Sequence, residues 1–360
     1  MWDVAVERQI MVKGPDAEAF VDYVITRDAT KIPPMRARYV ILCNNRGGVL
    51  NDPILLRLSK DEFWFSLADS DIGIYLQGVN HDNRFDVVID EIDVCPLQIQ
   101  GPKSLALMKD LVENQADIQN LPFYGMLEAK IGGHDCVISQ SGFSGEAGFE
   151  IYLRDATLHA DDLWYAVLEA GRKYRLMVTA PPHCRRIQAG ILSWGQDMDN
   201  QHDPFQCNLG YQVSLSGKGE WNKVGNYIGK DVLEQMRSEL KSGKKPYKLQ
   251  LVGLKMGGKP IEDFANDFWL ISADDFAEPC GFITSPWFHP DEKTNIAMAY
   301  VPFDGTLNRH GFPIGNYGQK FKVHLPDKYA EKSGEPVNAD VVKMPFTTSV
   351  NLNIREKIDS

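Results

Sequence analysis

A glycine-punctuated stretch near the middle of the chain has the composition of a ligand-contacting turn. Residues 137–153 have the sequence V-I-S-Q-S-G-F-S-G-E-A-G-F-E-I-Y-L, in which Gly142, Gly145 and Gly148 lie three residues apart. Glycine allows a backbone to turn sharply and to approach a ligand closely. A short apolar run enters the turn, and an alternating pattern typical of a strand leaves it. The stretch therefore predicts either a turn that contacts a ligand or a plain hairpin with a flexible loop.

A second stretch, residues 185–213, has the sequence R-R-I-Q-A-G-I-L-S-W-G-Q-D-M-D-N-Q-H-D-P-F-Q-C-N-L-G-Y-Q-V. Together the two stretches resemble the paired signatures of the folate-dependent aminomethyltransferase superfamily, whose founding member is the T-protein of glycine cleavage. That family carries a G-Y-T-G-E-x-G-F-E-I turn and, further on, L-R-L-E-A-G, L-Y-G-x-D-M-D and G-L-G-W-x-V. The chain is most similar to the dimethylsulfoniopropionate demethylase branch, through residues 2–9 (W-D-V-A-V-E-R-Q), 51–56 (N-D-P-I-L-L), 68–72 (A-D-S-D-I) and 190–198 (G-I-L-S-W-G-Q-D-M).

The resemblance spans about residues 2–325 and implies an α+β fold: two α+β lobes and a C-terminal β-barrel around a central folate channel. The order of the predicted elements agrees with this fold, because strands and helices alternate up to about residue 240 and short strands with glycine and proline turns follow. We expect a first lobe at residues 1–120, a second lobe at 121–240 and the barrel at 247–350. Relatives usually carry a further segment before the W-D-V strand, which predicts a shortened or differently built pocket wall here.

Hydrophobic periodicity and helix-start signals predict the elements that must position these motifs. Predicted helices lie at residues 16–25, 70–79, 103–112, 156–174, 181–190 and 230–240. Ser70 is the predicted N-cap of the second helix. Predicted barrel strands lie at residues 249–256, 268–272, 281–284, 296–301 and 320–324.

Asp71 is the predicted catalytic residue. Its position after the strand at residues 63–67 resembles that of the family's catalytic aspartate, which sits near N5 of the folate. A carboxylate there could orient the pterin and stabilise positive charge that develops at a nitrogen nucleophile. Tyr75 lies four residues on and shares its helical face. The alternative is that Asp69 or Asp71 only favours the helix N-terminus electrostatically.

Gln188 is an instructive departure from the family pattern. The family usually has glutamate in L-R-L-E-A-G, where the carboxylate grips the guanidine-like edge of the pterin with two acceptors. Glutamine offers one acceptor and two donors, so the charge-assisted clamp is lost. Three readings follow: folate binds more weakly, another group supplies the carboxylate, or the natural ligand differs. The structural alternative is a buried amide in the helix.

Aromatic residues mark the matching stretches. Phe143 and Trp194 replace tyrosines of the family pattern, and with Tyr75, Tyr211 and Gln188 they are the predicted folate-binding residues. A sulfonium or quaternary ammonium donor is a cation that has no hydrogen to donate, so an aromatic cage is the physical means to hold it.

The predicted cage for the methyl donor consists of Trp2, Trp64, Trp287 and Phe288. The last two belong to residues 284–288, which loosely resemble the family's T-S-G-x-x-S-P turn facing the channel. For any single aromatic residue the alternative is ordinary core packing. Lys218, Lys223 and Lys230 are candidate partners of the acidic folate tail, or else solvated surface lysines.

Composition restricts the partners. The chain has 360 residues and a formal net charge of −11, which argues against nucleic acid, and no segment has the length and apolarity of a membrane span. Six scattered cysteines without a C-x-x-C pair favour reduced thiols in the cytoplasm rather than a disulfide framework. No histidine or cysteine spacing predicts a metal site, the adjacent His183 and Cys184 included.

The leading hypothesis is an enzyme: a tetrahydrofolate-dependent methyltransferase acting as a demethylase on a small onium donor such as dimethylsulfoniopropionate. A sulfonium leaves as a neutral thioether, so the enzyme mainly needs to place donor and acceptor at attack distance. A methylated amine or a methoxy compound is another possible donor. The alternatives are an aminomethyltransferase of the glycine cleavage type and a non-catalytic protein that binds folate or a small ligand. We expect a monomer or a homodimer.

Overall fold

The structure is a computed structural model that describes residues 1–68, 70–113, 115–181, 183–216, 222–265, 267–274 and 278–347. The chain divides into two compact units. The first unit comprises Met1–Cys43, Leu50–Pro181 and Asn222–Ile228. The second unit comprises Asn44–Val49 and the described residues of Pro182–Trp221 and Gly229–Ser360. Each unit has its own hydrophobic core.

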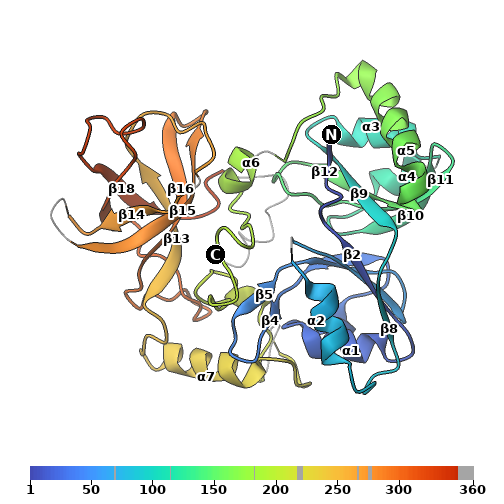
Figure 1. Ribbon diagram of the computed structural model, residues 1–360, viewed down its shortest axis with the longest axis horizontal. Coiled ribbons are helices and arrows are strands. Elements are labelled where there is room, and N and C mark those ends of the chain that lie inside the picture. The colour runs from blue at the N-terminus through green and yellow to red at the C-terminus, as the bar shows by residue number, and fades with distance from the viewer. Residues whose placement is uncertain are drawn as a thin grey trace. The chain divides into compact units, whose positions relative to one another are not determined.

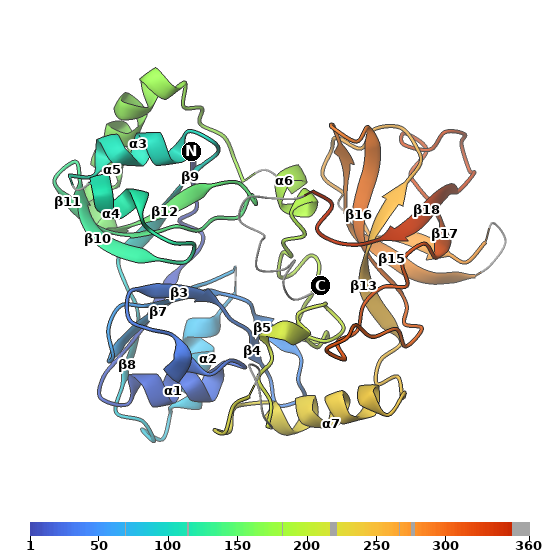
Figure 2. The same cartoon turned by 180° about the vertical axis from the view of Figure 1, so that it is seen from behind.

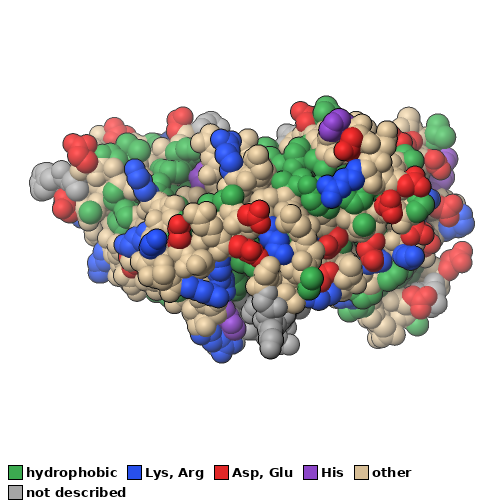
Figure 3. All heavy atoms as spheres, turned by 90° about the horizontal axis from the view of Figure 1, so that it is seen from below, with side chains coloured by type: hydrophobic (Ala, Val, Ile, Leu, Met, Phe, Trp, Pro, Cys, Tyr) green, Lys and Arg blue, Asp and Glu red, His purple; other side chains and the backbone are tan. Residues whose placement is uncertain are grey.

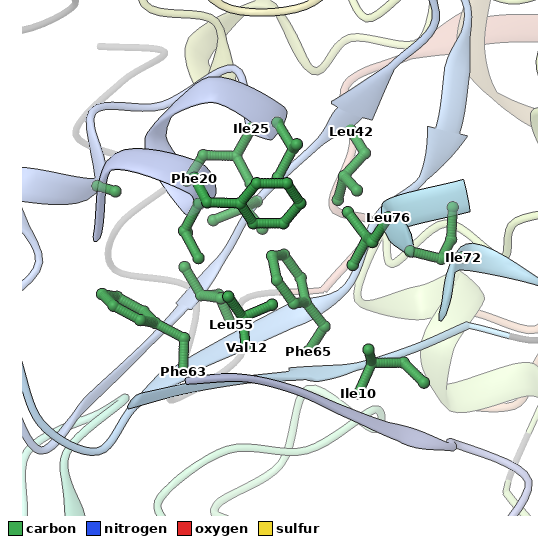
Figure 4. Close-up of a cluster of buried hydrophobic side chains, with 14 of the residues drawn as sticks. Ile10, Val12, Phe20, Ile25, Leu42, Leu55, Phe63, Phe65, Ile72 and Leu76 are labelled. Atoms are coloured by element: carbon green, nitrogen blue, oxygen red, sulfur yellow. The ribbon is translucent and has the colours of Figure 1, made fainter. Parts of the chain in front are cut away.

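The first sheet of the first unit is covered on one face by two helices. Its antiparallel strands run in the order β3 (Arg36–Tyr39), β6 (Ile54–Arg57), β7 (Glu62–Ser66), β2 (Gln9–Lys13) and β8 (Val88–Glu91), and the helices are α1 (Ala17–Val24) and α2 (Ile72–Val79). In α1 the buried residues Ala17, Phe20, Val21 and Val24 fall at the spacing of one helical face. Figure 4 shows Phe20 pointing toward the side chains of β7 and α2 that complete this core.

The second sheet of the same unit is covered by three helices. Its strand order is β1 (Trp2–Asp3), β9 (Val94–Gln100), β12 (Gly148–Arg154), β11 (His134–Ser139) and β10 (Met126–Ile131). The helices are α3 (Ser104–Leu111), α4 (Gln115–Gln119) and α5 (Ala156–Gly171). Alternate residues of β12, Phe149, Ile151 and Leu153, pack into the core beneath these helices.

The opposite faces of the two sheets pack against each other. A cluster of Leu56 and Trp64 from the first sheet and Val94, Val137 and Tyr152 from the second lies between them. The first unit therefore has four layers, helices, sheet, sheet and helices, which both ribbon views show (Figures 1 and 2). Because β12 is covered on both faces, every residue from Gly148 to Leu153 is buried.

The second unit is built on a closed six-stranded barrel. Its strands follow the order β13 (Leu249–Met256), β16 (Thr294–Pro302), β15 (Pro279–His289), β14 (Trp269–Ser272), β17 (Lys320–Val323) and β18 (Val337–Val342). Alternate residues such as Val252, Leu254, Ala297 and Ala299 fill the interior. Outside it, Ile187 of α6 (His183–Gln188) packs with Ile296 and Trp287. The remaining elements are β4 (Leu42–Cys43), β5 (Val49–Asn51), α7 (Lys230–Lys241), η1 (Ala29–Lys31), η2 (Arg172–Tyr174) and η3 (Gly210–Gln212).

Lys223 ties the returning segment Asn222–Ile228 to α1 within the first unit. Its ammonium group donates to the backbone oxygens of Asp22, Ile25 and Arg27 and pairs with the Asp22 carboxylate at 3.0 Å. Carbonyl oxygens at a helix C-terminus carry partial negative charge, which compensates this buried cation. Lys223 is 1% exposed and holds α1 instead of lying on the surface.

The other two candidate lysines for a folate tail differ in how they are placed. Lys230 is buried, 4.0 Å from the Glu234 carboxylate. Lys218 lies outside the described residues.

The predicted α+β fold with a C-terminal barrel is confirmed. The predicted helices are present with ends shifted by a few residues, whereas α4, the β10–β11 hairpin and β18 were not predicted. Ser70 as N-cap is wrong: Asp71 occupies that position, and the Ser70 hydroxyl accepts from Asn51 Nδ2 at 2.7 Å. The division of the chain at residues 120 and 240 stays a prediction.

We predict opposite effects for two glycine-to-alanine substitutions. At Gly48 a Cβ atom would lie 1.9 Å from the backbone oxygen of Asn200, so Gly48→Ala should destabilise the second unit by about 1–3 kcal/mol through overpacking. A Cβ atom added at Gly78 in α2 would have no neighbouring side chain or other element within 4 Å. Gly78→Ala should therefore stabilise the first unit by about 0.5–1 kcal/mol, because alanine reduces the backbone entropy of the unfolded chain. Urea unfolding midpoints measure both effects, and equal midpoints for the two variants would contradict the close approach at Gly48.

Candidate functional site

A row of polar side chains lies between the two sheets of the first unit. Across the second sheet, Trp2 pairs with Gln98, Gln98 with Glu150 and Glu150 with Ser139. Directly paired residues point to the same face of a sheet. That face is the one that packs on the first sheet, since Tyr152, two residues beyond Glu150, belongs to the inter-sheet cluster.

Glu150 is a buried carboxyl group with three donors. Gln98 Nε2 donates to it at 2.6 Å and the Tyr152 hydroxyl at 3.3 Å, and the Ser141 hydroxyl completes the set. Glu150 is 3% exposed, so these hydrogen bonds replace water around it. They also fix the direction of its two oxygens.

A second carboxyl group, Glu7, adjoins this row. The Ser66 hydroxyl donates to Glu7 at 3.3 Å and receives a hydrogen bond from Gln9 Nε2 at 2.9 Å. Burial raises the pKa of Glu7 well above its usual value, and the charge of Glu150 raises that pKa further. Burial also raises the pKa of Glu150, against the lowering effect of its three donors. The pair therefore keeps a proton to higher pH than ordinary carboxyl groups, with Glu7 the more strongly shifted member.

Two polar atoms of the row have no hydrogen-bond partner in the described structure. They are Trp2 Nε1, a donor, and Gln9 Oε1, an acceptor, and both are fully buried. Buried polar groups without partners are rare in proteins and call for an explanation. We name Glu7, Gln9, Trp2, Gln98 and Glu150 the polar row, and its spare donor and acceptor make it the candidate functional site of the first unit.

The glycine turn holds Phe143 beside the polar row. A Cβ atom at Gly142 or Gly148 would lie 2.0 Å or 2.3 Å from the side chain of Gln100, so the close approach that requires glycine is to this glutamine. Gln100 in turn donates to the Ser141 backbone oxygen at 3.0 Å. The backbone N–H of Phe143 donates to Gln98 Oε1 at 3.4 Å, which places the backbone of this half-buried residue next to the row.

Asp71 and Tyr75 lie on α2 of the first unit. Asp71 is exposed and pairs with Arg8 Nη2 at 3.1 Å, and its side chain makes no capping hydrogen bond. Tyr75 is half-buried against the helix-covered core, and burial raises its pKa to about 12. Asp69, the other aspartate considered, lies outside the described residues.

Trp64 occupies the inter-sheet core. It is 1% exposed, its Nε1 donates to Glu62 at 3.1 Å, and the Arg154 guanidinium lies 4.7 Å from its ring centroid. Its ring face is thus already covered by a cation. Trp64 was predicted to belong to the cage for the methyl donor, but its position matches the alternative, ordinary core packing.

In the second unit, Gln188 is a buried amide on α6. Its Oε1 accepts from Arg185 Nη1 at 2.8 Å, while its Nε2 has no partner in the described structure. Its backbone oxygen accepts from the backbone N–H groups of Phe346 and Thr347 at 2.9 and 3.2 Å. Gln188 therefore retains a spare donor.

The other predicted residues of this unit occupy separate places. Trp194 Nε1 donates to the Val49 backbone oxygen at 3.1 Å, and Tyr211 lines a cavity of about 70 Å³ together with Phe312. Trp287 meets the His183 ring edge-on, with centroids 5.4 Å apart. Burial lowers the pKa of His183 to about 4, so this imidazole is neutral. Phe288 is half-buried on β15.

The D-M-D motif builds a buried ion pair in the second unit. Arg186 Nη1 lies 2.7 Å from Asp197 Oδ2, and the Thr284 and Ser285 hydroxyls both donate to Asp197 Oδ1 at 2.6 Å. The Tyr300 hydroxyl donates to the Asp197 backbone oxygen at 2.8 Å. Residues 284–288, expected to form a turn, lie in strand β15, and Thr284 and Ser285 of this strand hold α6 and the D-M-D loop to the barrel.

The sequence interpretation missed Glu150, Glu7 and Gln98. Glu150 lies in the alternating segment F-E-I-Y-L, where a single charged residue predicts a solvated face. Only the pairing of two sheets shows that this face is covered.

Comparisons with known proteins establish the family. The family model of the GCVT N-terminal domain matches residues 1–217. The dimethylsulfoniopropionate demethylase DmdA of Ruegeria pomeroyi is 32% identical over 303 residues, 84% of this chain and 77% of the relative. An aminomethyltransferase of Caldanaerobacter subterraneus is 30% identical over 307 residues, 84% of this chain and 76% of the relative.

A solved structure supports the fold. The crystal structure of glycine cleavage system aminomethyltransferase T from Bartonella henselae has a TM-score of 0.76, with 24% identity over 96% of this chain and 85% of that one. The chain belongs to the GCVT aminomethyltransferase family. It is an enzyme of that class, a tetrahydrofolate-dependent one-carbon transferase, and the resemblance inferred from the sequence is confirmed.

Among the described residues, no helix is long and apolar enough to cross a bilayer. On the face drawn in Figure 3, acidic and basic side chains are interspersed rather than gathered by sign. All six cysteines are described, and they are free thiols.

We predict that Glu7 makes the stability of the first unit fall as the pH rises. Its folded-state pKa is raised, so the folded state keeps a proton that the unfolded chain releases above about pH 4.5, and stability is lost from there upward. Glu7→Gln mimics the protonated form and should flatten this loss, by at most about 1.4 kcal/mol per pH unit. Urea unfolding midpoints between pH 5 and 8 measure how steeply the stability falls with pH. Glu128→Gln, at an exposed position, is the control. Equal slopes of stability against pH in wild type and Glu7→Gln would contradict the raised pKa of Glu7.

Proposed function

We propose that this enzyme moves a methyl group from a small onium donor, such as dimethylsulfoniopropionate, to N5 of tetrahydrofolate. The similarity to a dimethylsulfoniopropionate demethylase supports the donor class. The observation that carries the proposal is the polar row, which offers a buried carboxyl group, a spare donor and a spare acceptor next to the backbone of Phe143. These residues fit a pterin.

Glu150 is proposed to take the role that Gln188 cannot. The edge of a pterin presents adjacent N–H donors, and Glu150, which already accepts three hydrogen bonds, keeps one accepting position on Oε1 for one of them. Gln98 and Tyr152 hold the Glu150 oxygens in place, so little order is lost on binding. Phe143 would supply a stacking face, and Trp2 Nε1 and Gln9 Oε1 would gain partners. This reading corresponds to the expectation that another group supplies the carboxylate.

The sequence-based predictions that Trp2, Trp287 and Phe288 each contact the onium cation stay predictions, since a ring face attracts a cation that cannot donate hydrogen bonds. Tyr75, Trp194 and Tyr211 stay proposed folate contacts. Tetrahydrofolate supplies the nucleophilic nitrogen. Asp71 is proposed to stabilise the positive charge there, and its exposed carboxylate with one salt bridge to Arg8 leaves an oxygen for that contact.

A second candidate is an aminomethyltransferase of the glycine cleavage type, because such enzymes are nearly as similar to the chain. It would deliver a methylene group from a lipoyl-bound carrier instead of a methyl group. The central channel, a cytoplasmic location, the absence of nucleic-acid partners and a monomer or homodimer stay predictions.

We expect tetrahydrofolate to bind and to depend on Glu150. In an anaerobic titration followed by tryptophan fluorescence, Glu150→Gln should weaken binding roughly 10- to 100-fold, the loss of one charge-assisted hydrogen bond. Gln188→Ala should have a smaller effect, and Glu128→Gln on the exposed face of β10 should have none. Loss of binding in Gln188→Ala alone would place the pterin at α6, and no binding to wild type at millimolar ligand would overturn the folate site.

The product separates the two candidate reactions. With tetrahydrofolate and dimethylsulfoniopropionate, mass spectrometry should show 5-methyltetrahydrofolate and the demethylated thioether in equal amounts. Asp71→Asn should lower kcat roughly 10²- to 10³-fold with folate affinity unchanged, whereas the exposed Asp82→Asn should behave as wild type. Formation of methylenetetrahydrofolate from an aminomethyl-lipoyl carrier, without turnover of onium donors, would favour the second candidate.

A further inference from the structure

Three metal-ligand side chains meet on the helix-covered side of the second sheet. They are His134 on β11 and His159 and Asp162 on α5, and their potential ligand atoms all lie within 4.8 Å of one another. His134 Nε2 is 3.2 Å from Asp162 Oδ2. The His134 and His159 rings stack with centroids 4.1 Å apart. We name these residues the His-His-Asp cluster.

Packed elements hold the cluster, because a tight turn places His134 and one helix face places its partners. Gly132 and Gly133 have φ of +60° and +90°, as in the two-residue hairpin turn that needs positive φ at both positions, and His134 follows directly. His159 and Asp162 are three residues apart on α5 and so share a face. Rigid elements of this kind preorganise ligand atoms better than loops do.

The helix and the turn touch each other. A Cβ atom at Gly132 would lie 3.4 Å from Ala166 Cβ, so α5 packs directly on the hairpin end. Leu163 and Val167 anchor the same helix in the core beneath it. The distance between the two elements that carry the three side chains is therefore set by the packing of the unit.

We propose that the His-His-Asp cluster binds one Zn²⁺ ion. Two imidazole nitrogens and one carboxylate oxygen are a donor set that zinc takes in proteins at about 2.0–2.2 Å, with water in the fourth position. Ligands around such an ion lie about 3.4 Å apart. The distance of 3.2 Å between His134 Nε2 and Asp162 Oδ2 already has this spacing. Rotation of the His159 ring would bring its nitrogen to the same distance from these two atoms. Mg²⁺ and Ca²⁺ prefer oxygen ligands and are a poor match.

This cluster is separate from the polar row. Along β11, His134 shares its face with Cys136 and Ile138, which belong to the core beneath the helices. Ser139, which pairs with Glu150, faces the other sheet. The sheet thus lies between the two sites, and the bound ion would join α5 to the β10–β11 hairpin. Its predicted effect is on the stability of the first unit.

This site could not be predicted from the sequence, because its ligands come from two elements. His159 and Asp162 are separated from His134 by a strand and a turn, so no short metal-binding motif exists. The expectation of no metal was drawn from motif spacing alone.

The test is a calorimetric titration of metal-free protein with ZnCl₂. We expect one equivalent to bind, a higher thermal midpoint with zinc, and no heat with MgCl₂. His159→Ala and Asp162→Asn should each weaken zinc binding at least tenfold and remove the thermal shift. His81→Ala, an exposed histidine elsewhere in the first unit, should bind as wild type.

Two controls keep the result decisive. Thermal midpoints in EDTA show whether each variant folds as wild type, and the isosteric Asp162→Asn serves if His159→Ala does not. A Co²⁺ spectrum without a sulfur-to-metal charge-transfer band, and unchanged binding in Cys184→Ser, exclude a cysteine site. No zinc binding to wild type, or binding that both cluster variants retain, would overturn the proposal.

Discussion

The burial of a carboxyl group in a strand covered on both faces is the constraint on which the candidate site depends. β12 lies between the helix-covered core and the inter-sheet layer, and Glu150 points into that layer. A carboxyl group without water costs several kcal/mol unless donors or a proton compensate it. The structure supplies both means: Gln98, Ser141 and Tyr152 donate to Glu150, and burial raises the pKa of both Glu7 and Glu150, so the pair holds a proton to higher pH than ordinary carboxyl groups do.

The second unit contains a buried charge that is compensated in a different way. The Asp197 carboxylate pairs with Arg186 and accepts hydrogen bonds from two hydroxyl groups and a backbone N–H. All accepting positions of its two oxygens are therefore occupied. Such a network rigidifies a structure and leaves no capacity for a ligand. The polar row keeps a spare donor at Trp2 and a spare acceptor at Gln9. This contrast supports a structural role for the D-M-D motif and a binding role for the row, although both stretches belong to the same family signature.

Local patterns predicted the elements whose burial is one-sided. α1 and α7 have one apolar face, and their positions follow from periodicity alone. The β10–β11 hairpin was not predicted because its first strand, M-L-E-A-K-I, is half exposed, although Gly132 and Gly133 are the residues that a two-residue hairpin turn favours. The buried position of Lys223 was not predicted for a related reason. A lysine in a polar segment predicts a solvated side chain, and only the tertiary structure brings the end of α1 around it. The same limit applies to Glu150, whose second covering layer comes from another sheet.

The register of β12 is what keeps the two proposed sites apart. Successive residues of a strand face opposite layers, so a slip by one residue would move Glu150 into the helix-covered core and Ile151 into the polar row. Pairing of Glu150 with Gln98 on one side and with Ser139 on the other fixes the register. The glycine turn also fixes this register, because Gly142 and Gly148 lie directly against the Gln100 side chain at the end of β9. A larger residue at either glycine position would overlap with Gln100. Gly142 and Gly148 are therefore required by their close approach to Gln100, through which they act on the register of β12 and on the position of Phe143.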